Sequence, residues 1–173
     1  MAIIIDTNCL ANVFSRNSKK HDDFAPVLEW VINGKGVLVF GGTKYMNELR
    51  KTTKYMKIIK LLNDCKKVYI GNKTNIDKIQ AEIEKRNRCS DFDDPHLPAI
   101  VIDTKCKLIC SEDTQSVPHV KDEKWYPKHI AVPCFYTGLR NTDLLCDQYI
   151  DKCYKPLCKI KKEKKKLLIT LCK

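Results

Sequence analysis

Acidic side chains stand at points where the sequence changes between apolar and polar residues. Asp6 directly follows the apolar run 2–5, and Asp113 closely follows a second apolar run. Glu48 and Asp94 lie in or beside segments with helical spacing. Carboxylate oxygens favour hard cations, here Mg²⁺ or Mn²⁺. Such a cation can activate a water and stabilise the attacking and leaving oxygens of a phosphodiester, so the four acids are candidates for a hydrolytic metal site.

The segment that leads into Asp6 predicts where this side chain lies. Residues 3–5 are consecutive β-branched apolar residues, a pattern typical of a strand that is buried on both faces. Thr7 or Asn8 can cap the helical turn that follows. Ligands bind at the carboxyl ends of the strands in an open α/β sheet, so we expect Asp6 at the floor of a cleft. A simple helix cap is the alternative role for Asp6.

Length and composition predict a single globular domain. The chain has 173 residues, of which 43% are hydrophobic and 31% charged, and this length is sufficient for a full hydrophobic core. No apolar run approaches the roughly 18 residues that a membrane span requires. The N-terminus has neither the basic start nor the cleavage site of a signal peptide. We therefore expect a cytoplasmic protein without a membrane segment.

The formal net charge of +11 is concentrated at the C-terminal end. Residues 151–173 contain nine lysines against two acids, which gives this segment +7 and leaves +4 for residues 1–150. A basic segment of this kind most often contacts phosphate groups, and a solvated tail that only aids solubility is the alternative. We expect one domain over residues 1–150 and a lysine-rich tail over residues 151–173.

The ten cysteines do not by themselves indicate a metal centre or a disulfide framework. No two are arranged as Cys-x-x-Cys, and the four histidines form no matching cluster, whereas structural zinc sites usually use such close pairs. Cys146, Cys153 and Cys158 are the least implausible zinc ligands. Without a secretory signal we expect no disulfide scaffold, and several cysteines are expected to pack as small apolar side chains.

Apolar runs and segments with helical spacing alternate about five times along the chain. The expected strands are 2–5, 36–40, 68–71, 107–110 and 130–135. The expected helices are a turn after Asn8, a helix from Asp22 or Asp23 to Ile32, and segments 43–62, 75–88, 95–105 and 137–154, with a short helix within 114–128. Pro133 places the last strand at an edge of the sheet. This alternation predicts a three-layer α/β/α sandwich with a mainly parallel five-stranded sheet.

This architecture is expected to bring the four acids together. Asp6 ends the first strand, and Asp113 follows the fourth. Glu48 lies in the helix entered from the second strand, and its side chain leans back toward the strand ends. Asp94 is expected to cap the helix before the fourth strand, with Pro95 at its first position. Carboxylates that meet in this way raise one another's pKa unless a cation neutralises them.

Each acid also has a purely structural interpretation. Glu48 on a helix is most often a solvated charge, Asp94 can serve only as an N-cap, and Asp113 can be a turn residue. A chance coincidence of all four in the right order is much rarer than any one of them.

The order of these motifs resembles that of a PIN-domain nuclease over roughly residues 1–135. The resemblance is carried by Ile3-Ile4-Ile5-Asp6-Thr7-Asn8, Glu48 in a helix, Asp94-Pro95-His96-Leu97-Pro98-Ala99 and Ile109-Cys110-Ser111-Glu112-Asp113. It implies the strand order 3-2-1-4-5 and a Mg²⁺- or Mn²⁺-dependent endoribonuclease that prefers single-stranded RNA. Many members of this family are toxins of bacterial toxin–antitoxin pairs and are usually dimeric. An antitoxin protein and a second copy of the chain are therefore candidate partners besides RNA.

The resemblance also implies roles for individual residues. Asp6, Glu48, Asp94 and Asp113 would be the catalytic acids and metal ligands, supported by Thr7, Asn8, Asp91 and Ser111. Asp91 and Asp93 crowd the third acid, and Asp94 is preferred because it alone precedes a Pro-x-x-x-Ala helix start. The candidates for holding the RNA backbone are Lys44, Arg50, Lys51, Arg86, Arg88, Lys161, Lys162, Lys164 and Lys165.

Two other functions are compatible with parts of the sequence. A non-catalytic RNA-binding module would keep the fold and use the basic C-terminal segment, but the complete set of acids argues against it. A phosphatase of the haloacid-dehalogenase kind also begins with an apolar strand that ends in Asp. Its chemistry needs a second Asp two residues later, where this chain has Asn8.

Overall fold

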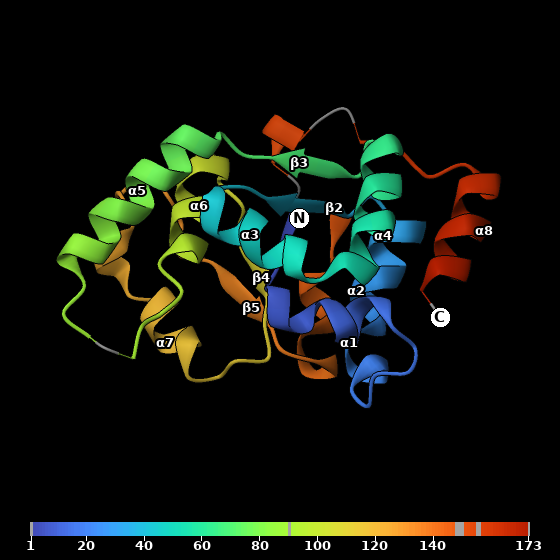
Figure 1. The fold of residues 1–173 in the computed structure, drawn as a ribbon, viewed down its shortest axis with the longest axis horizontal. Coiled ribbons are helices and arrows are strands. Elements are labelled where there is room, and N and C mark those ends of the chain that lie inside the picture. Colours follow the sequence, from blue (N-terminus) through green and yellow to red (C-terminus); the bar gives the residue numbers. More distant parts are fainter. Residues whose placement is uncertain (1, 90, 148–150, 155–156, 173) are drawn as a thin grey trace.

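A five-stranded parallel sheet runs through the centre of the protein, as the computed structural model shows (Figure 1). The structure describes residues 2–89, 91–147, 151–154 and 157–172. The strands have the order β3-β2-β1-β4-β5, and every neighbouring pair is parallel, which confirms the predicted α/β fold and strand order. Their bounds are β1 (Ala2–Ile5), β2 (Val37–Phe40), β3 (Val68–Ile70), β4 (Leu108–Cys110) and β5 (Cys134–Tyr136).

The central strands are short and apolar on both faces. All residues of β1, β2 and β4 are buried, and Ile3, Ile4 and Ile5 have no exposed surface. A strand that is covered on both sides has no solvent-facing positions, so its sequence is a continuous apolar run rather than an alternating one. The core of the protein therefore forms around β1, β2 and β4. Asp6 directly follows β1, and Ser111 directly follows β4.

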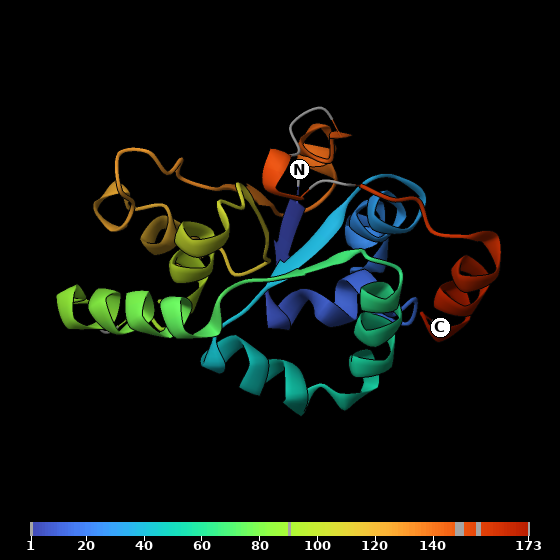
Figure 2. The ribbon, with the colours of Figure 1, turned by 90° about the horizontal axis from the view of Figure 1, so that it is seen from above.

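Helices connect the strands and lie on both sides of the sheet (Figures 1 and 2). In chain order, with η marking a 3-10 helix, they are η1 (Thr7–Cys9), α1 (Leu10–Phe14), α2 (His21–Asn33), α3 (Thr43–Lys51), α4 (Thr53–Asp64), α5 (Lys73–Arg86), α6 (His96–Thr104), α7 (Ser116–Val120), η2 (Glu123–Trp125), η3 (Leu139–Leu144), η5 (Lys152–Tyr154) and α8 (Lys162–Leu171).

The direction of the connections reverses between β1 and β4. After β1 the chain builds β2 and β3 on one side, and it then returns to build β4 and β5 on the other side. The carboxyl ends of two such strands open a crevice in which α/β proteins bind ligands. Ile5 pairs with Cys110, and the backbone N–H of Asp6 donates to the Cys110 carbonyl at 2.9 Å. Asp6 therefore lies at this reversal point.

The predicted caps of the first helical turn are wrong. Asp6 occupies the N-cap position of η1 and Cys9 that of α1, and neither makes a side-chain capping hydrogen bond. Neither Thr7 nor Asn8 acts as the cap. The carboxylate of Asp6 is instead turned toward Ser111 at the end of β4. The N-cap position of Asp6 in the chain therefore does not explain the direction of its side chain.

The predicted helix 43–62 is two helices, because the backbone leaves the helical conformation at Thr52. The N-cap of α3 is Gly42, which has a φ of +77° that glycine adopts without steric cost. The N–H and hydroxyl of Thr43 bind the Asp77 carboxylate of α5 at 2.6 and 2.5 Å. Thr43 therefore joins two helices instead of capping one.

The start of α6 also differs from the prediction. The helix begins at His96, and its N-cap is Pro95 rather than Asp94. Proline has no N–H to offer, and the first turn closes through the backbone bond from Leu97 to the Asp94 carbonyl at 3.0 Å. The Asp94 side chain is thereby released from the capping role.

The C-terminal region differs most from the prediction. No continuous helix covers the described part of 137–154: η3 contains a non-helical residue, Asn141, whose side chain accepts from the Thr137 N–H at 3.0 Å. Such local bonds compete with helix formation, and residues 148–150 lie outside the described residues. The lysine-rich segment forms α8, which packs on α4 (Figure 1) and contains the fully buried Leu168. The fifth strand begins at Cys134, later than predicted, and its predicted edge position is confirmed.

Within the described part of the chain, no helix combines the length and apolar character that crossing a bilayer requires.

Candidate active site

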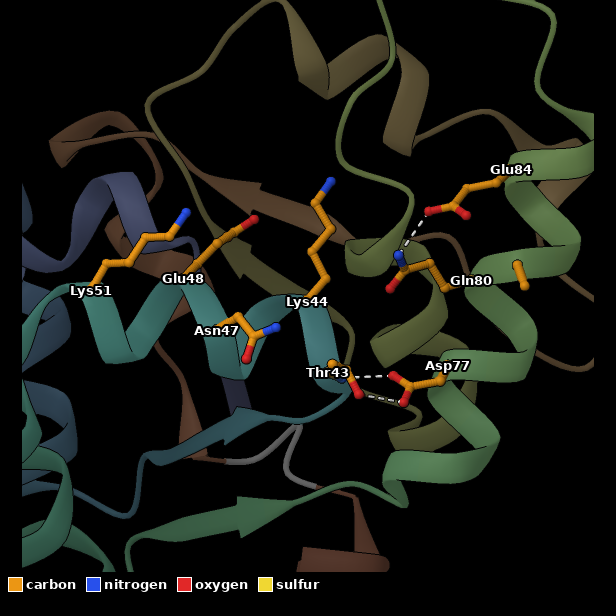
Figure 3. A pocket seen from close by; sticks show the side chains of 9 residues that line it. Thr43, Lys44, Asn47, Glu48, Lys51, Asp77, Gln80 and Glu84 are labelled. Atoms are coloured by element: carbon orange, nitrogen blue, oxygen red, sulfur yellow. Dashed lines mark hydrogen bonds between the residues drawn. The ribbon is translucent and has the colours of Figure 1, made fainter.

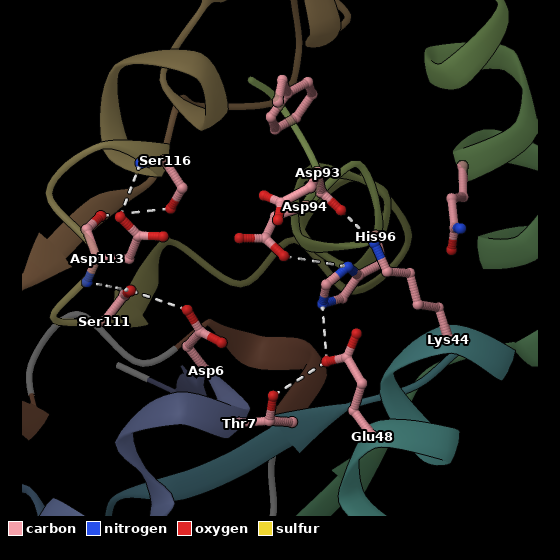
Figure 4. Close-up of polar contacts among 12 residues, drawn as sticks. Asp6, Thr7, Lys44, Glu48, Asp93, Asp94, His96, Ser111, Asp113 and Ser116 are labelled. Atoms are coloured by element: carbon pink, nitrogen blue, oxygen red, sulfur yellow. Dashed lines mark hydrogen bonds and ion pairs between the residues drawn. The ribbon is translucent and has the colours of Figure 1, made fainter. Parts of the chain in front are cut away.

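The carboxyl ends of β1 and β4 place Asp6 and Ser111 beside each other. Asp6 is 4% exposed, and the Ser111 hydroxyl donates to its Oδ2 at 2.8 Å. The backbone N–H of Asp113 in turn donates to the Ser111 Oγ at 3.1 Å. Ser111 therefore links the loop after β4 to the acid after β1 (Figure 4).

Helix α3 is fastened to the end of β1 and brings Glu48 to the same place. The hydroxyl of buried Tyr45 donates to the Ile5 carbonyl, one residue before Asp6. One helical turn later, the Oε2 of Glu48 accepts from the Thr7 hydroxyl at 3.0 Å. Glu48 thus has a fixed partner on η1, whereas the sequence alone left open that it was only a solvated charge.

The start of α6 brings Asp94 and His96 to the cluster. His96 is 1% exposed, its Nδ1 lies 3.8 Å from Asp94 Oδ1, and its Nε2 lies 3.7 Å from Glu48 Oε2. Burial and the positive charge of Lys44 lower the pKa of His96 to about 3. The imidazole is therefore uncharged at neutral pH, and its contacts with the two carboxylates are not ion pairs.

Asp113 both turns the chain and faces the cluster. Its Oδ1 accepts from the backbone N–H groups of Gln115 and Ser116 at 2.9 and 3.2 Å, which makes it a turn residue before α7. Its charge also raises the pKa of Asp6. Asp113 is therefore both a turn residue and a member of the acidic cluster.

Electrostatic repulsion from neighbouring acids contributes to the raised pKa values of Asp6 and Asp94. Burial raises the pKa of Asp6, the Ser111 hydroxyl and the Asn8 backbone N–H lower it, and the charges of Glu48 and Asp113 raise it further. Burial and the charges of Asp6 and Asp93 are the largest causes that raise the pKa of Asp94 to about 7, with a smaller contribution from Glu48. Desolvation and like charges both disfavour ionised carboxylates. The site is therefore a partly buried concentration of negative charge, and the positive charge of Lys44 offsets part of it at Asp94.

The contacts of the four acids follow one pattern. Among the described residues, the side-chain hydroxyl bonds of Asp6 and Glu48, the backbone bonds of Asp113 and the histidine contacts fall on one oxygen of each acid: Oδ2 of Asp6, Oε2 of Glu48, Oδ1 of Asp94 and Oδ1 of Asp113. The Asn8 N–H also approaches the Asp6 carboxylate. The second oxygens are the donor atoms that a hard cation prefers. Within residues 2–89, 91–147, 151–154 and 157–172, no group of three or more His, Cys, Asp or Glu side chains is close enough together to hold a metal ion. The donor chemistry of the carboxylates fits Mg²⁺ or Mn²⁺, and a shared ion requires them to approach one another.

Two of the predicted basic residues lie in a cleft that opens beside Glu48. The cleft has a volume of about 470 Å³ and lies between α3 and α5. Lys44, Glu48 and Lys51 project from one side of α3, as expected for positions three and four residues apart (Figure 3). Lys44 donates to the Asp93 carbonyl, so it is part of the acidic site, whereas Lys51 is exposed along the cleft.

The other predicted basic residues lie elsewhere. Arg50 contacts Asn47 at 3.5 Å and lines a different cavity. Arg86 donates to the Lys124 carbonyl at 2.8 Å and lies over the Trp125 ring, so it is engaged in packing. Arg88 is exposed just after α5. Helix α8, with Lys161, Lys162, Lys164 and Lys165 at or near its start, lies beside α4 and away from α6 and α7 in both views (Figures 1 and 2).

The remaining supporting candidates differ in their contacts. Asn8 is exposed, and it faces Asp6 through its backbone N–H rather than its side chain. Asp91 is exposed in the loop before α6. Asp93 is also exposed and offers its carbonyl to Lys44, so Asp94 is the member of this acidic loop whose carboxylate lies with Asp6 and Glu48.

His96 is the site residue to which the sequence analysis gave no role. In the sequence, His96 stands out only as part of the Asp94-Pro95-His96 motif. The available signal was a histidine two residues after a candidate ligand, at the start of a helix that is otherwise apolar. A lone histidine of this kind does not reveal from sequence whether its ring faces the core, the solvent or the acids.

Comparison with known proteins agrees with the motifs. The profile of the PIN domain matches residues 2–115. Comparison with curated proteins gave no match, and comparison with solved structures gave none either. The matched range includes β1 to β4 and all four acids, and it confirms the resemblance inferred from the motifs. The chain therefore belongs to the PIN-domain family, a family of metal-dependent nucleases.

Proposed function

We propose that this protein is an endoribonuclease that hydrolyses phosphodiester bonds of single-stranded RNA with Mg²⁺ or Mn²⁺ as cofactor. The proposal depends on one observation: Asp6, Glu48, Asp94 and Asp113 come from four remote segments and meet at the reversal point of the sheet. Repulsion among buried carboxylates is unfavourable unless a cation offsets it. A cation site is the function that this arrangement supports best.

The side chains of the site would have two roles, binding the metal ion and orienting its ligands. The second oxygens of the four acids would hold the ion, while Ser111 and Thr7 keep the first oxygens of Asp6 and Glu48 in place. A bound Mg²⁺ or Mn²⁺ would lower the pKa of a water and stabilise negative charge on the phosphodiester. The water oxygen would lose a proton to solvent as it forms a new bond to phosphorus, in line with the leaving oxygen. The bond from phosphorus to the leaving oxygen would break, and that oxygen would take up a proton from solvent.

The RNA strand would pass along the cleft between α3 and α5. Lys51 lies one turn beyond Glu48 on the same side of α3 and is exposed there. A cation at this distance from the acids can hold a phosphate that neighbours the one being cleaved, while the acids repel the strand elsewhere. This placement makes Lys51 the strongest of the predicted backbone-binding residues.

A cleavage assay with the purified protein tests the proposal. We expect a single-stranded RNA labelled at both ends to be cut internally in the presence of Mn²⁺ or Mg²⁺ and to stay intact when EDTA is added. Salt-sensitive RNA binding without any metal-dependent cleavage would contradict the proposal and favour the non-catalytic RNA-binding module instead.

The hydrogen bond from Ser111 to Asp6 gives a first quantitative prediction. Ser111→Ala removes one donor from the buried Asp6 carboxylate and one acceptor from the Asp113 N–H. Groups that orient ligands typically contribute 10–100-fold to metal affinity, and leaving buried partners unsatisfied costs about 1–3 kcal/mol. We expect weaker Mn²⁺ binding in a calorimetric titration and a lower free energy of unfolding in urea.

A control for this variant is Thr170→Val in α8, whose hydroxyl donates to the Lys166 carbonyl of its own helix. We expect it to bind Mn²⁺ as the natural protein does. Equal Mn²⁺ affinity of Ser111→Ala and the natural protein would show that Ser111 does not orient Asp6.

We further propose that α8 binds RNA phosphates at a distance from the site of cleavage. Replacing Lys161, Lys162, Lys164 and Lys165 by Gln should reduce the slope of log affinity against log salt by up to about 0.7 for each lost phosphate contact. The rate of cleavage at saturating RNA should stay the same, because α8 lies away from the acids. Fluorescence anisotropy over a salt series measures the slope, and Lys128→Gln in an exposed loop is the control. An unchanged slope would contradict the prediction.

Narrower forms of the proposal rest on the family alone. They are that the nuclease is the toxin of a toxin–antitoxin pair in the cytoplasm, and that its protein partners are an antitoxin and a second copy of the chain. The division into a nuclease domain, 1–150, and a basic C-terminal segment, 151–173, is also a proposal.

A further inference from the structure

The buried ring of His96 is not explained by the packing of the fold. His96 begins α6 and is 1% exposed, and its neighbours in the helix are apolar. In the part of the chain that the structure describes, neither Nδ1 nor Nε2 has a hydrogen-bond partner. Burying an unsatisfied polar group costs about 1–3 kcal/mol. An apolar side chain of similar size would fill the same space without that cost.

The carboxylates that face the ring come from helix α3 and from the loop before α6. Nε2 lies 3.7 Å from Oε2 of Glu48 in α3, and Nδ1 lies 3.8 Å from Oδ1 of Asp94, just before α6 (Figure 4). The imidazole is rigid, and its nitrogens stand on different edges of the ring. The uncharged ring has one N–H, which can orient one of the two carboxylates, while the body of the ring separates that carboxylate from the other acid.

The ring contacts fall on one oxygen of each carboxylate and do not involve the other. His96 and Thr7 both approach Oε2 of Glu48, and the contact with Asp94 falls on Oδ1. Neither contact involves Oε1 of Glu48 or Oδ2 of Asp94. Both distances are longer than a hydrogen bond, and contacts of this kind are often long in a free enzyme and tighten when the site is assembled.

We propose that His96 is a positioning residue, which holds the Glu48 and Asp94 carboxylates so that the oxygens it does not touch bind one divalent cation together with Asp6. This inference rests on the proposed function, because it assumes that these acids bind a metal. His96 itself touches neither the substrate nor the reacting atoms. Its effect on cleavage arises through the spacing of the two acids.

Mn²⁺ binding, followed by the electron paramagnetic resonance signal of the free ion, tests the role of the ring. His96→Phe keeps an aromatic ring and removes both nitrogens, and His96→Leu serves the same purpose if the phenyl ring prevents folding. We expect either variant to bind Mn²⁺ about 10–100-fold more weakly than the natural protein, as for other groups that orient ligands. His96→Gln keeps one polar atom near the position of Nε2 and should recover most of that loss. His129→Gln, at an exposed position, is the matched control and should bind normally.

The outcomes separate this inference from the proposed function. Normal Mn²⁺ binding by His96→Phe or His96→Leu would overturn the role of His96, as would a loss in His96→Gln as large as that in the apolar variants. If those results came with loss of Mn²⁺ binding in Asp6→Asn, the metal site itself would still stand. Absence of Mn²⁺ binding by the natural protein would overturn both proposals.

Discussion

Replacing Asp6 with Asn is expected to lower the rate of RNA cleavage by on the order of 10³-fold or more while the protein stays folded. Metal-ion catalysis supplies several kcal/mol of stabilisation to the transition state, and each 1.36 kcal/mol corresponds to a tenfold rate. Asp6 lies at the centre of the cluster, because its charge raises the pKa of Asp94 and its own pKa is raised by Glu48 and Asp113. Losing this ligand therefore affects the whole site.

The fold should tolerate this change because Asn has the shape of Asp without its charge. The Ser111 hydroxyl can still donate to the side-chain oxygen at position 6, and a neutral amide carries a smaller desolvation cost in a buried place than an ionised carboxylate. Single-turnover cleavage and circular dichroism measure the two effects. Asp22→Asn, at an exposed position of α2, is the control and should cleave normally. Unimpaired cleavage by folded Asp6→Asn protein would exclude this site as the centre of the reaction.

Replacing Asp94 with Asn should stabilise the metal-free protein above neutral pH. Burial and nearby negative charge raise the pKa of Asp94 from 3.8 to about 7. An acid with a raised pKa in the folded state stabilises the fold below its unfolded pKa, and this contribution is lost as the pH rises through the folded value. The natural protein should thus lose free energy of unfolding between about pH 4 and pH 7, and Asp94→Asn removes this loss.

The size of the effect follows from 1.36 kcal/mol for each pKa unit, which sets an upper bound of about 4 kcal/mol. We expect about 2 kcal/mol at pH 8, which raises the midpoint of thermal unfolding by about 4–8 °C in a chain of this length. Thermal unfolding in EDTA at pH 4 and pH 8 is the measurement. Asp22→Asn changes an exposed acid of α2 and should shift the midpoint little. A gain in Asp94→Asn that is the same at both pH values would contradict this account.

The strands could be predicted because each carries its own local pattern. Residues 2–5 form a strand between two other buried strands, so no position faces water and the run is wholly apolar. Helix ends were less predictable. The chain turns at Thr52 and at Asn141 through contacts that the helical spacing of apolar residues does not record.

The acidic cluster was predicted as a set of residue types at the ends of elements, and its actual contacts were not. Three acids crowd the loop before α6, and only the folded chain shows that the Asp94 carboxylate lies with Asp6 and Glu48 while Asp93 and Asp91 are exposed. Arg86 was predicted to contact RNA. Its guanidinium donates to the Lys124 carbonyl and packs on the Trp125 ring, contacts that the sequence did not predict.

The sequence by itself determined the alternation of strands and helices and the presence of an acid after the first and fourth strands. Both follow from polarity and spacing within a few residues. The tertiary structure alone decided that Ser111 turns toward Asp6, that Thr7 and His96 both turn toward Glu48, and that α8 packs against α4. These contacts join residues that are remote in the chain. A shift of one residue in a helix rotates its side chain by about 100°, so local patterns cannot specify which distant groups meet.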